Sequence, residues 1–134
     1  MGSAVVLLTA EDGLADTVRP RLDAAGADCA RVVALTAVRS PGGGASSGFS
    51  LERDLAALED AVTRTPGVRL AIVDPISAYM GKTDSHRNAD VRGVLAPLTE
   101  MAARRRIGIL CVDHLNKGQA SKVLYRASGS LAFV

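Results

Sequence analysis

The sequence predicts an α/β domain in three layers, with helices on both faces of a mostly parallel β-sheet. Two observations support this prediction. Short apolar runs rich in β-branched residues alternate with longer segments in which apolar residues recur every three or four positions. Helical connections between such runs make successive strands of one sheet parallel. The chain of 134 residues has room for one hydrophobic core, so we expect residues 1–134 to form a single domain.

The first part of the chain predicts a strand, a helix and a second strand. The run AVVLL at residues 4–8 has the composition of a strand covered on both faces. Apolar residues then recur at helical spacing over residues 14–25, and Gly26 is expected to end this helix. Pro20 should kink the helix or delay its start. Residues 31–35 indicate the next strand.

The middle of the chain begins with a Gly- and Ser-rich stretch at residues 40–48, which predicts a flexible loop. Ser50 has the position of an N-cap for a helix whose first turn is acidic, as the helix dipole favours. That helix should end before Pro66. Residues 68–73 form the second strongly apolar run and predict a buried strand.

The last part repeats the pattern, with a polar loop at residues 81–87, a helix, and a third apolar strand over residues 107–112. Pro97 lies inside this helix and should bend it. The predicted buried face of the helix consists of Val91, Val94, Leu95, Leu98 and Met101. The chain begins directly on a strand and stops after a renewed apolar stretch at Val134. We therefore expect an incomplete sheet, without a first strand and without its C-terminal strands.

Composition narrows the function classes. Aromatic residues make up 3% of the chain, with no Trp, so few rings are available to stack on nucleic-acid bases. A formal net charge of +2 is too small to indicate a polyanionic partner. No apolar run approaches the roughly 20 residues of a membrane span, and no signal peptide opens the chain. Cys29 and Cys111 lack metal-binding spacing and are expected to be reduced thiols in a cytoplasmic protein.

Polar residues follow each apolar strand, where parallel α/β sheets bind their ligands. Singly, each can be explained as a solvated strand end or a helix cap, and this explanation is weakest for Asp74, which closes a fully apolar run. Together they place acids, an imidazole and an amine at one edge of the sheet, which is a candidate site. An unrelated metal-dependent phosphotransfer domain that uses Asp74 and Asp113 also remains open. The residues are Glu11 and Asp12 after the first strand, Asp74 after the second strong strand, and Asp113, His114, Asn116 and Lys117 after the third.

Several of these segments form a family pattern. LAIVDP at residues 70–75 has the form of a Walker B strand, four apolar residues followed by an aspartate. LTAED at residues 8–12 precedes it, and HLNK at 114–117 and YRASGS at 125–130 follow it. In this order the motifs resemble the AAA-family P-loop ATPases related to plasmid RepA-type hexameric replicative helicases, a branch of the RecA-like group. The resemblance covers nearly the whole chain and implies a RecA-like fold.

The resemblance also implies roles for individual residues. Glu11 would polarise the water that attacks the γ-phosphate of ATP, and Asp74 would hold the Mg²⁺ shell. His114, or Asn116 beside it, would sense the γ-phosphate. Arg126 would be the finger arginine that reaches a nucleotide held by the adjacent subunit, assisted by Lys117. Asp12 lies beside the water-polarising acid and is expected to contact the nucleotide.

One element of the family is missing from the sequence. A P-loop needs a Gly-rich turn followed by Gly, Lys and Ser or Thr, ahead of the Glu11 strand. Gly81, Lys82 and Thr83 do not supply it, because the required earlier glycine position is Ile76 and the segment follows the Walker B strand. The glycines at 42–44 have no Lys behind them and indicate only a loop.

The resulting prediction is a fragment of a Mg²⁺-dependent ATPase motor of the RepA or DnaB helicase type, from DNA replication or plasmid or phage maintenance. The parent would work as a homo-oligomeric ring, a hexamer, in the cytoplasm. This chain alone is expected to be inactive without the phosphate loop. The alternative is a non-catalytic, degenerate ATPase fold kept for oligomer contacts. A DNA contact is left open for residues 82–87 and for the basic run at 104–106, which is also explained by the helix dipole.

Overall fold

The computed structural model describes residues 2–38, 47–81 and 88–114, and these contain a four-stranded sheet in which every neighbouring pair is parallel. The strand order is β2-β1-β5-β6, so the first strand of the chain lies inside the sheet. The predicted α/β fold with a parallel sheet is therefore confirmed, and it is consistent with a RecA-like domain. The strands are β1 (Ala4–Thr9), β2 (Val32–Ala34), β5 (Val68–Asp74) and β6 (Gly108–Cys111).

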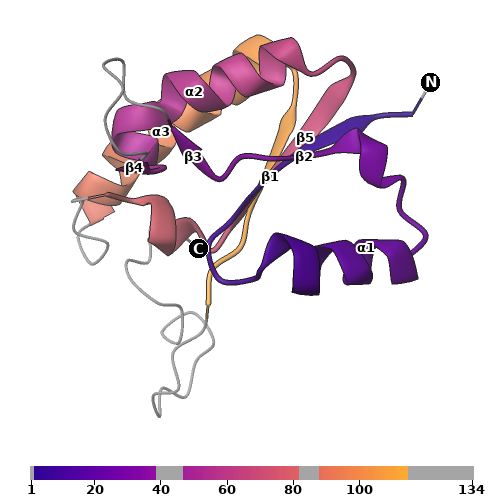
Figure 1. The fold of residues 1–134 in the computed structure, drawn as a ribbon. Coiled ribbons are helices and arrows are strands. Elements are labelled where there is room, and N and C mark those ends of the chain that lie inside the picture. The colour runs from indigo at the N-terminus through magenta and orange to yellow at the C-terminus, as the bar shows by residue number, and fades with distance from the viewer. Residues whose placement is uncertain (1, 39–46, 82–87, 115–134) are drawn as a thin grey trace, which may run out of the picture.

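Helices cover the two faces of the sheet unequally. In Figure 1, α2 (Leu51–Arg64) and α3 (Asn88–Arg105) pack side by side on one face, and α1 (Arg19–Ala24) lies on the other. This placement follows from right-handed crossovers. The connection through α1 crosses the sheet in one direction, from β1 to β2. The connections through α2 and α3 run in the opposite direction, to β5 and then to β6, so these helices lie on the opposite face. Among the described residues, α1 is the one helix on its face of the sheet.

The hydrophobic core lies between the sheet and the pair α2 and α3. Side chains alternate along β1 and β5, so one set points into this core and the other points toward α1. The core-facing set, Val6, Leu8, Ala71 and Val73, is fully buried. Leu7 and Ile72 on the α1 face are only half-buried, and Leu110 on β6 is 51% exposed. Among the described residues, the α1 face of the sheet is therefore less deeply buried than the face that carries α2 and α3.

The first helical segment begins in two steps. A π-helical turn, Leu14–Val18, precedes α1, and Pro20 occupies the first turn of α1, where a missing N–H costs nothing. The α-helix thus starts late, next to Pro20, which is one of the two outcomes that the sequence predicted. Gly26 has a φ of 72° and follows the helix, as predicted.

The start of α2 differs from the expected N-cap. Ser50 is the capping residue, but its side chain makes no capping hydrogen bond. Instead the buried Asp54 accepts the Ser50 backbone N–H at 2.9 Å and pairs with Arg53 at 2.6 Å. Asp54 has a non-helical φ of −116°, which allows its side chain to turn back toward Ser50.

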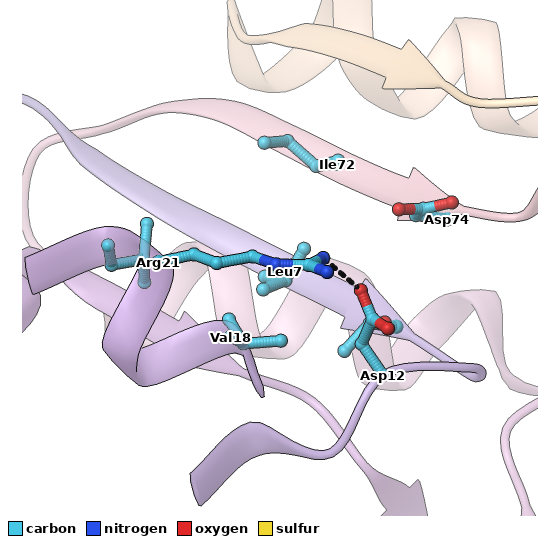
Figure 2. Close-up of a pocket in the computed structure, with 8 residues that line it drawn as sticks. Leu7, Asp12, Val18, Arg21, Ile72 and Asp74 are labelled. Carbon is cyan, nitrogen blue, oxygen red and sulfur yellow. Dashed lines mark hydrogen bonds and ion pairs between the residues drawn. The ribbon is translucent and has the colours of Figure 1, made fainter. Parts of the chain in front are cut away.

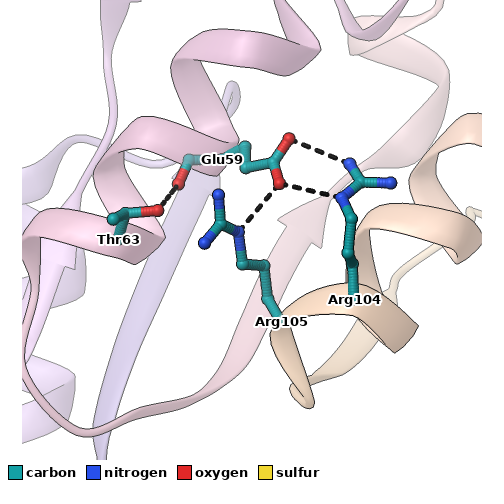
Figure 3. A network of polar contacts seen from close by, with 4 residues as sticks. All are labelled: Glu59, Thr63, Arg104 and Arg105. Carbon is teal, nitrogen blue, oxygen red and sulfur yellow. Dashed lines mark hydrogen bonds and ion pairs between the residues drawn. The ribbon is translucent and has the colours of Figure 1, made fainter.

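A charged network fastens the end of α3 to α2. Glu59 of α2 accepts hydrogen bonds from Arg104 at 3.0 Å and from Arg105 at 2.8 Å, as Figure 3 shows. Two basic residues of the run at 104–106 are therefore engaged within the fold. This arrangement gives them a structural role in addition to the dipole effect that the sequence suggested.

Two short features were not predicted. β3 (Ala37–Val38) and β4 (Ser47–Gly48) form a separate antiparallel ribbon, so part of the predicted loop at 40–48 has a strand partner. A 3₁₀ turn, Ile76–Tyr79, follows β5 and buries Ile76 and Tyr79. No helix within the described ranges is long and apolar enough to cross a membrane.

Candidate functional site

The ends of β1, β5 and β6 are joined by backbone hydrogen bonds. Thr9 and Asp74 are register partners, and the Ala10 N–H donates to the Asp74 carbonyl at 3.0 Å. On the other side of β5, the Val112 N–H donates to the Val73 carbonyl at 2.9 Å. These bonds align the three strand ends, so the residues just beyond them lie along one edge of the sheet.

Three of the predicted site residues meet at this edge. The His114 ring lies between two carboxylates, with Nδ1 3.5 Å from Glu11 Oε2 and Nε2 3.7 Å from Asp74 Oδ1. Both distances allow ion pairing when the ring is protonated. The three side chains keep contact with solvent, with exposed fractions of 47% for His114, 59% for Glu11 and 38% for Asp74. The carboxylates and the imidazole are thus accessible to a bound ligand.

Asp12 lies apart from this group and pairs with Arg21 of α1, with Oδ2 and Nη1 3.0 Å apart. Figure 2 shows this ion pair at the rim of a cavity between α1 and the sheet. The cavity measures about 290 Å³ and is walled mainly by apolar side chains. Asp74 also borders it, so the cavity adjoins the three-residue group. Its lining consists of Leu7, Thr9, Asp12, Val18, Arg21, Leu22, Ile72 and Asp74.

Asp113, half-buried, is a further acid at this edge. Its Oδ1 accepts the His114 backbone N–H at 3.0 Å. Its Oδ2 is buried and has no hydrogen-bond partner in the described part of the chain. Burial raises the pKa of Asp113 above its ordinary value. Burial also raises the pKa of Tyr79, and the negative charge of Asp74 adds to that effect.

The remaining predicted residues, Asn116, Lys117 and Arg126, lie outside the described residues, as do residues 82–87. The sequence reasoning did not single out Arg21, which approaches Asp12 only because α1 turns back over β1. It also did not assign Thr9, whose position opposite Asp74 follows from strand register. Neither residue carries a motif signal in a single sequence.

The donor chemistry suits magnesium and a reacting water. Mg²⁺ prefers carboxylate oxygens and in nucleotide sites takes one or two of them, with phosphate oxygens and waters completing its shell. Asp74 offers one such carboxylate and Glu11 a second. Within residues 2–38, 47–81 and 88–114, no group of three or more His, Cys, Asp or Glu side chains is placed to hold a metal ion unaided. The printed sequence contains no Gly-rich loop ending in Gly-Lys-Ser or Gly-Lys-Thr with P-loop spacing.

The family of the chain is shown by sequence comparison. A family model described as AAA domain matches residues 2–120, which is most of the chain. The chain therefore belongs to the AAA domain family, a family of P-loop nucleoside triphosphatases that generally bind ATP and magnesium. No curated protein matches the sequence.

Proposed function

We propose that this member of the AAA domain family provides the water-activating and magnesium-binding side of an ATPase motor of the RepA or DnaB helicase type, acting in DNA replication or in plasmid or phage maintenance. The observation behind the proposal is the position of His114 between Glu11 and Asp74. A carboxylate, a second carboxylate and an imidazole at the ends of adjacent parallel strands form a set suited to phosphoryl transfer to water.

Each residue has a distinct task in this proposal. Glu11 is the most exposed of the three and accepts a proton from the attacking water, which is oriented by its carboxylate. Asp74, at the end of β5, would hold the magnesium ion, whose chemical contribution is to neutralise charge on the phosphates. With nucleotide bound, His114 would turn one ring N–H from its carboxylate neighbour toward the γ-phosphate oxygen, which is its sensing role in this proposal. Asp12 pairs with Arg21, and in this proposal the loop after β1 that carries Asp12 contacts the nucleotide.

The phosphate cradle has to come from a segment other than the 134 residues printed here. Backbone N–H groups of such a loop, with its lysine, hold the β- and γ-phosphates. Arg126 and Lys117 complete the site from the next subunit of a ring, a hexamer, in the same proposal. Asn116 shares the sensing role of His114.

A second candidate function is a non-catalytic interaction module with an ATPase fold. The observation in its favour is the absence of a P-loop motif in the sequence. Such a module would keep the sheet and its oligomer contacts without turnover. Glu11, Asp74 and His114 would then tolerate substitution.

The deciding experiment purifies the tagged chain from its native cells and measures magnesium-dependent ATP hydrolysis by whatever assembly contains it. We expect turnover that falls by about 10²–10⁴-fold when the tagged chain carries Glu11→Gln, because a positioned general base contributes that much. Asp16→Asn, an exposed acid of the π-helical turn, is the matched control and should leave turnover unchanged. Equal rates for the parent and Glu11→Gln assemblies would favour the interaction module.

A further inference from the structure

The carboxyl group of Asp113 lies at this edge and has no task in the proposed reaction. It follows β6, and its two oxygens have different surroundings. Oδ1 accepts the His114 backbone N–H at 3.0 Å, while Oδ2 is buried without a partner among the described residues. Buried carboxyl oxygens are nearly always hydrogen-bonded, so one that is not requires an explanation.

The backbone around Asp113 gives that explanation. The Val112 N–H donates to Val73 at 2.9 Å, and the Val112 carbonyl accepts the Ile76 N–H at 2.8 Å, so the chain is fixed against β5 up to Val112. Two residues later the His114 ring lies between Glu11 and Asp74. Between these two points, the Asp113 carboxyl accepts the hydrogen bond of the adjacent His114 N–H.

We propose that Asp113 is a positioning residue, which holds the His114 backbone so that the imidazole lies between Glu11 and Asp74. Enclosure of Oδ2 restricts rotation of the half-buried carboxyl and thus the direction of Oδ1. Burial raises the pKa of Asp113, and the carboxyl can accept the N–H through Oδ1 in either protonation state. The unpaired Oδ2 is the cost of enclosing the group. The catalytic meaning of this placement rests on the proposed function, but the placement itself does not.

Two substitutions distinguish the effect of the Asp113 hydrogen-bond acceptor from the effect of its negative charge. Asp113→Asn keeps the carbonyl oxygen in nearly the same shape, while Asp113→Leu has similar volume and no acceptor. Asp60→Leu, at an exposed acid of α2 away from this edge, is the control for a general loss of stability. The measurement is NMR of the labelled 134-residue chain, kept below the concentration at which it self-associates. His86 is the only other histidine, and His86→Gln assigns the ring signals.

The expected result is that Asp113→Asn preserves the hydrogen-exchange protection of the His114 amide and the nuclear Overhauser contacts between the His114 ring and the Glu11 side chain. Asp113→Leu should speed exchange of that amide by about tenfold or more and remove the ring contacts, as for a locally opened segment. Asp60→Leu should change neither. If Asp113→Leu does not fold, Asp113→Ala takes its place under the same criterion.

Retained ring contacts and amide protection in the variants without an acceptor would overturn the proposal, and so would loss of both in Asp113→Asn. A similar loss in Asp60→Leu would also overturn it, because the change would then be general. None of these readouts needs ATP turnover. An inactive native assembly would therefore contradict the proposed function while leaving the positioning role of Asp113 decided by NMR alone.

Discussion

Glu11 and His114 lie 3.5 Å apart between Oε2 and Nδ1, although they follow strands at opposite ends of the described chain. β5 lies between β1 and β6 in the sheet, so the His114 ring reaches across the end of β5 to meet Glu11. Asp74, at that end, lies on the same ring at 3.7 Å. A change in the register of β1 or β6 against β5 would separate the three side chains, because a slip of one residue turns every side chain of that strand to the other face.

The first prediction concerns nucleotide affinity. The 134-residue chain on its own should bind MgATP no more tightly than about 1 mM, roughly −4 kcal/mol, because it lacks the backbone donors and lysine of a P-loop. Isothermal titration calorimetry with MgATP measures this directly, with Asp74→Asn as the comparison. Micromolar affinity that Asp74→Asn abolishes would mean that the chain carries a complete phosphate site.

The second prediction concerns the pH dependence of stability. Hydrogen bonds from Arg104 and then from Arg105 lower the pKa of Glu59 below its ordinary value. A depressed carboxylate pKa stabilises the fold above the unfolded pKa of about 4.3, and this contribution is lost as the pH falls through the folded pKa. Glu59→Gln should therefore lower the urea midpoint at pH 7, and the difference from the parent should shrink below about pH 4.

The comparison for Glu59 is Asp60→Asn on the same helix. Asp60 pairs with Arg64 alone, four residues away on the exposed side of α2, whereas Glu59 joins α2 to α3. Asp60→Asn should thus change the midpoint less at pH 7. A Glu59→Gln difference that stays constant from pH 7 to pH 3 would contradict an electrostatic origin.

Local sequence patterns predicted β1, β2, β5, β6 and the three helices, because apolar periodicity reports which residues an element buries. They did not predict how unequally the described residues bury the two faces of the sheet, since that depends on the six-residue length of α1. The capping of α2 by Asp54 was missed because it depends on a backbone distortion at Asp54 itself. The closeness of Glu11, Asp74 and His114 was expected from strand ends, while the enclosure of Asp113 Oδ2 depends on packing that no motif encodes.

The third prediction concerns Gly81, which ends the segment after β5. Its φ is 69°, and a Cβ there would lie 2.5 Å from Ser50 Oγ and 3.0 Å from Glu52 Oε2. Gly81→Ala should destabilise the fold by about 1–3 kcal/mol, from backbone strain and from the displaced side chains. Gly93→Ala is the matched control in α3, with nothing near its Cβ position, and should stabilise by about 0.5–1 kcal/mol. Equal effects in urea denaturation would contradict this difference.

The fourth prediction concerns the free edge of β6. In the described part of the chain, β6 pairs only with β5, and Leu110 beside that edge is 51% exposed. An unpaired, apolar edge favours pairing with another chain. The 134-residue chain should therefore self-associate with rising concentration, and Leu110→Lys should raise the concentration of onset by about tenfold, roughly 1.4 kcal/mol.

Light scattering over a concentration series tests association through β6. Ala24→Lys adds the same charge at an exposed position of α1 and should leave the onset where it is in the parent. A parent chain that stays monomeric at high concentration, or an equal shift in both variants, would contradict an association through β6.

The last prediction separates the proposed tasks of Glu11 and Arg126 in the native ATP-hydrolysing assembly. Glu11→Gln removes the base but keeps shape and hydrogen bonding, so ATP should bind without turnover. Arg126→Ala should abolish turnover as well, because a finger arginine is worth about 10³–10⁵ in rate. Each variant alone should be inactive, so the turnover of their mixture is what distinguishes the two roles.

In a mixed ring, some interfaces pair a subunit that keeps Glu11 with a neighbour that keeps Arg126. With equal amounts and random assembly this is about one interface in four, so up to about a quarter of the parent turnover should return. An arginine acting within its own subunit would give no recovery, because every subunit lacks one of the two groups. Mass spectrometry confirms that mixed rings form, and Asp16→Asn mixed with Arg126→Ala shows how far simple dilution lowers the rate. Mixed rings without recovery at any ratio would remove Arg126 from a role between subunits.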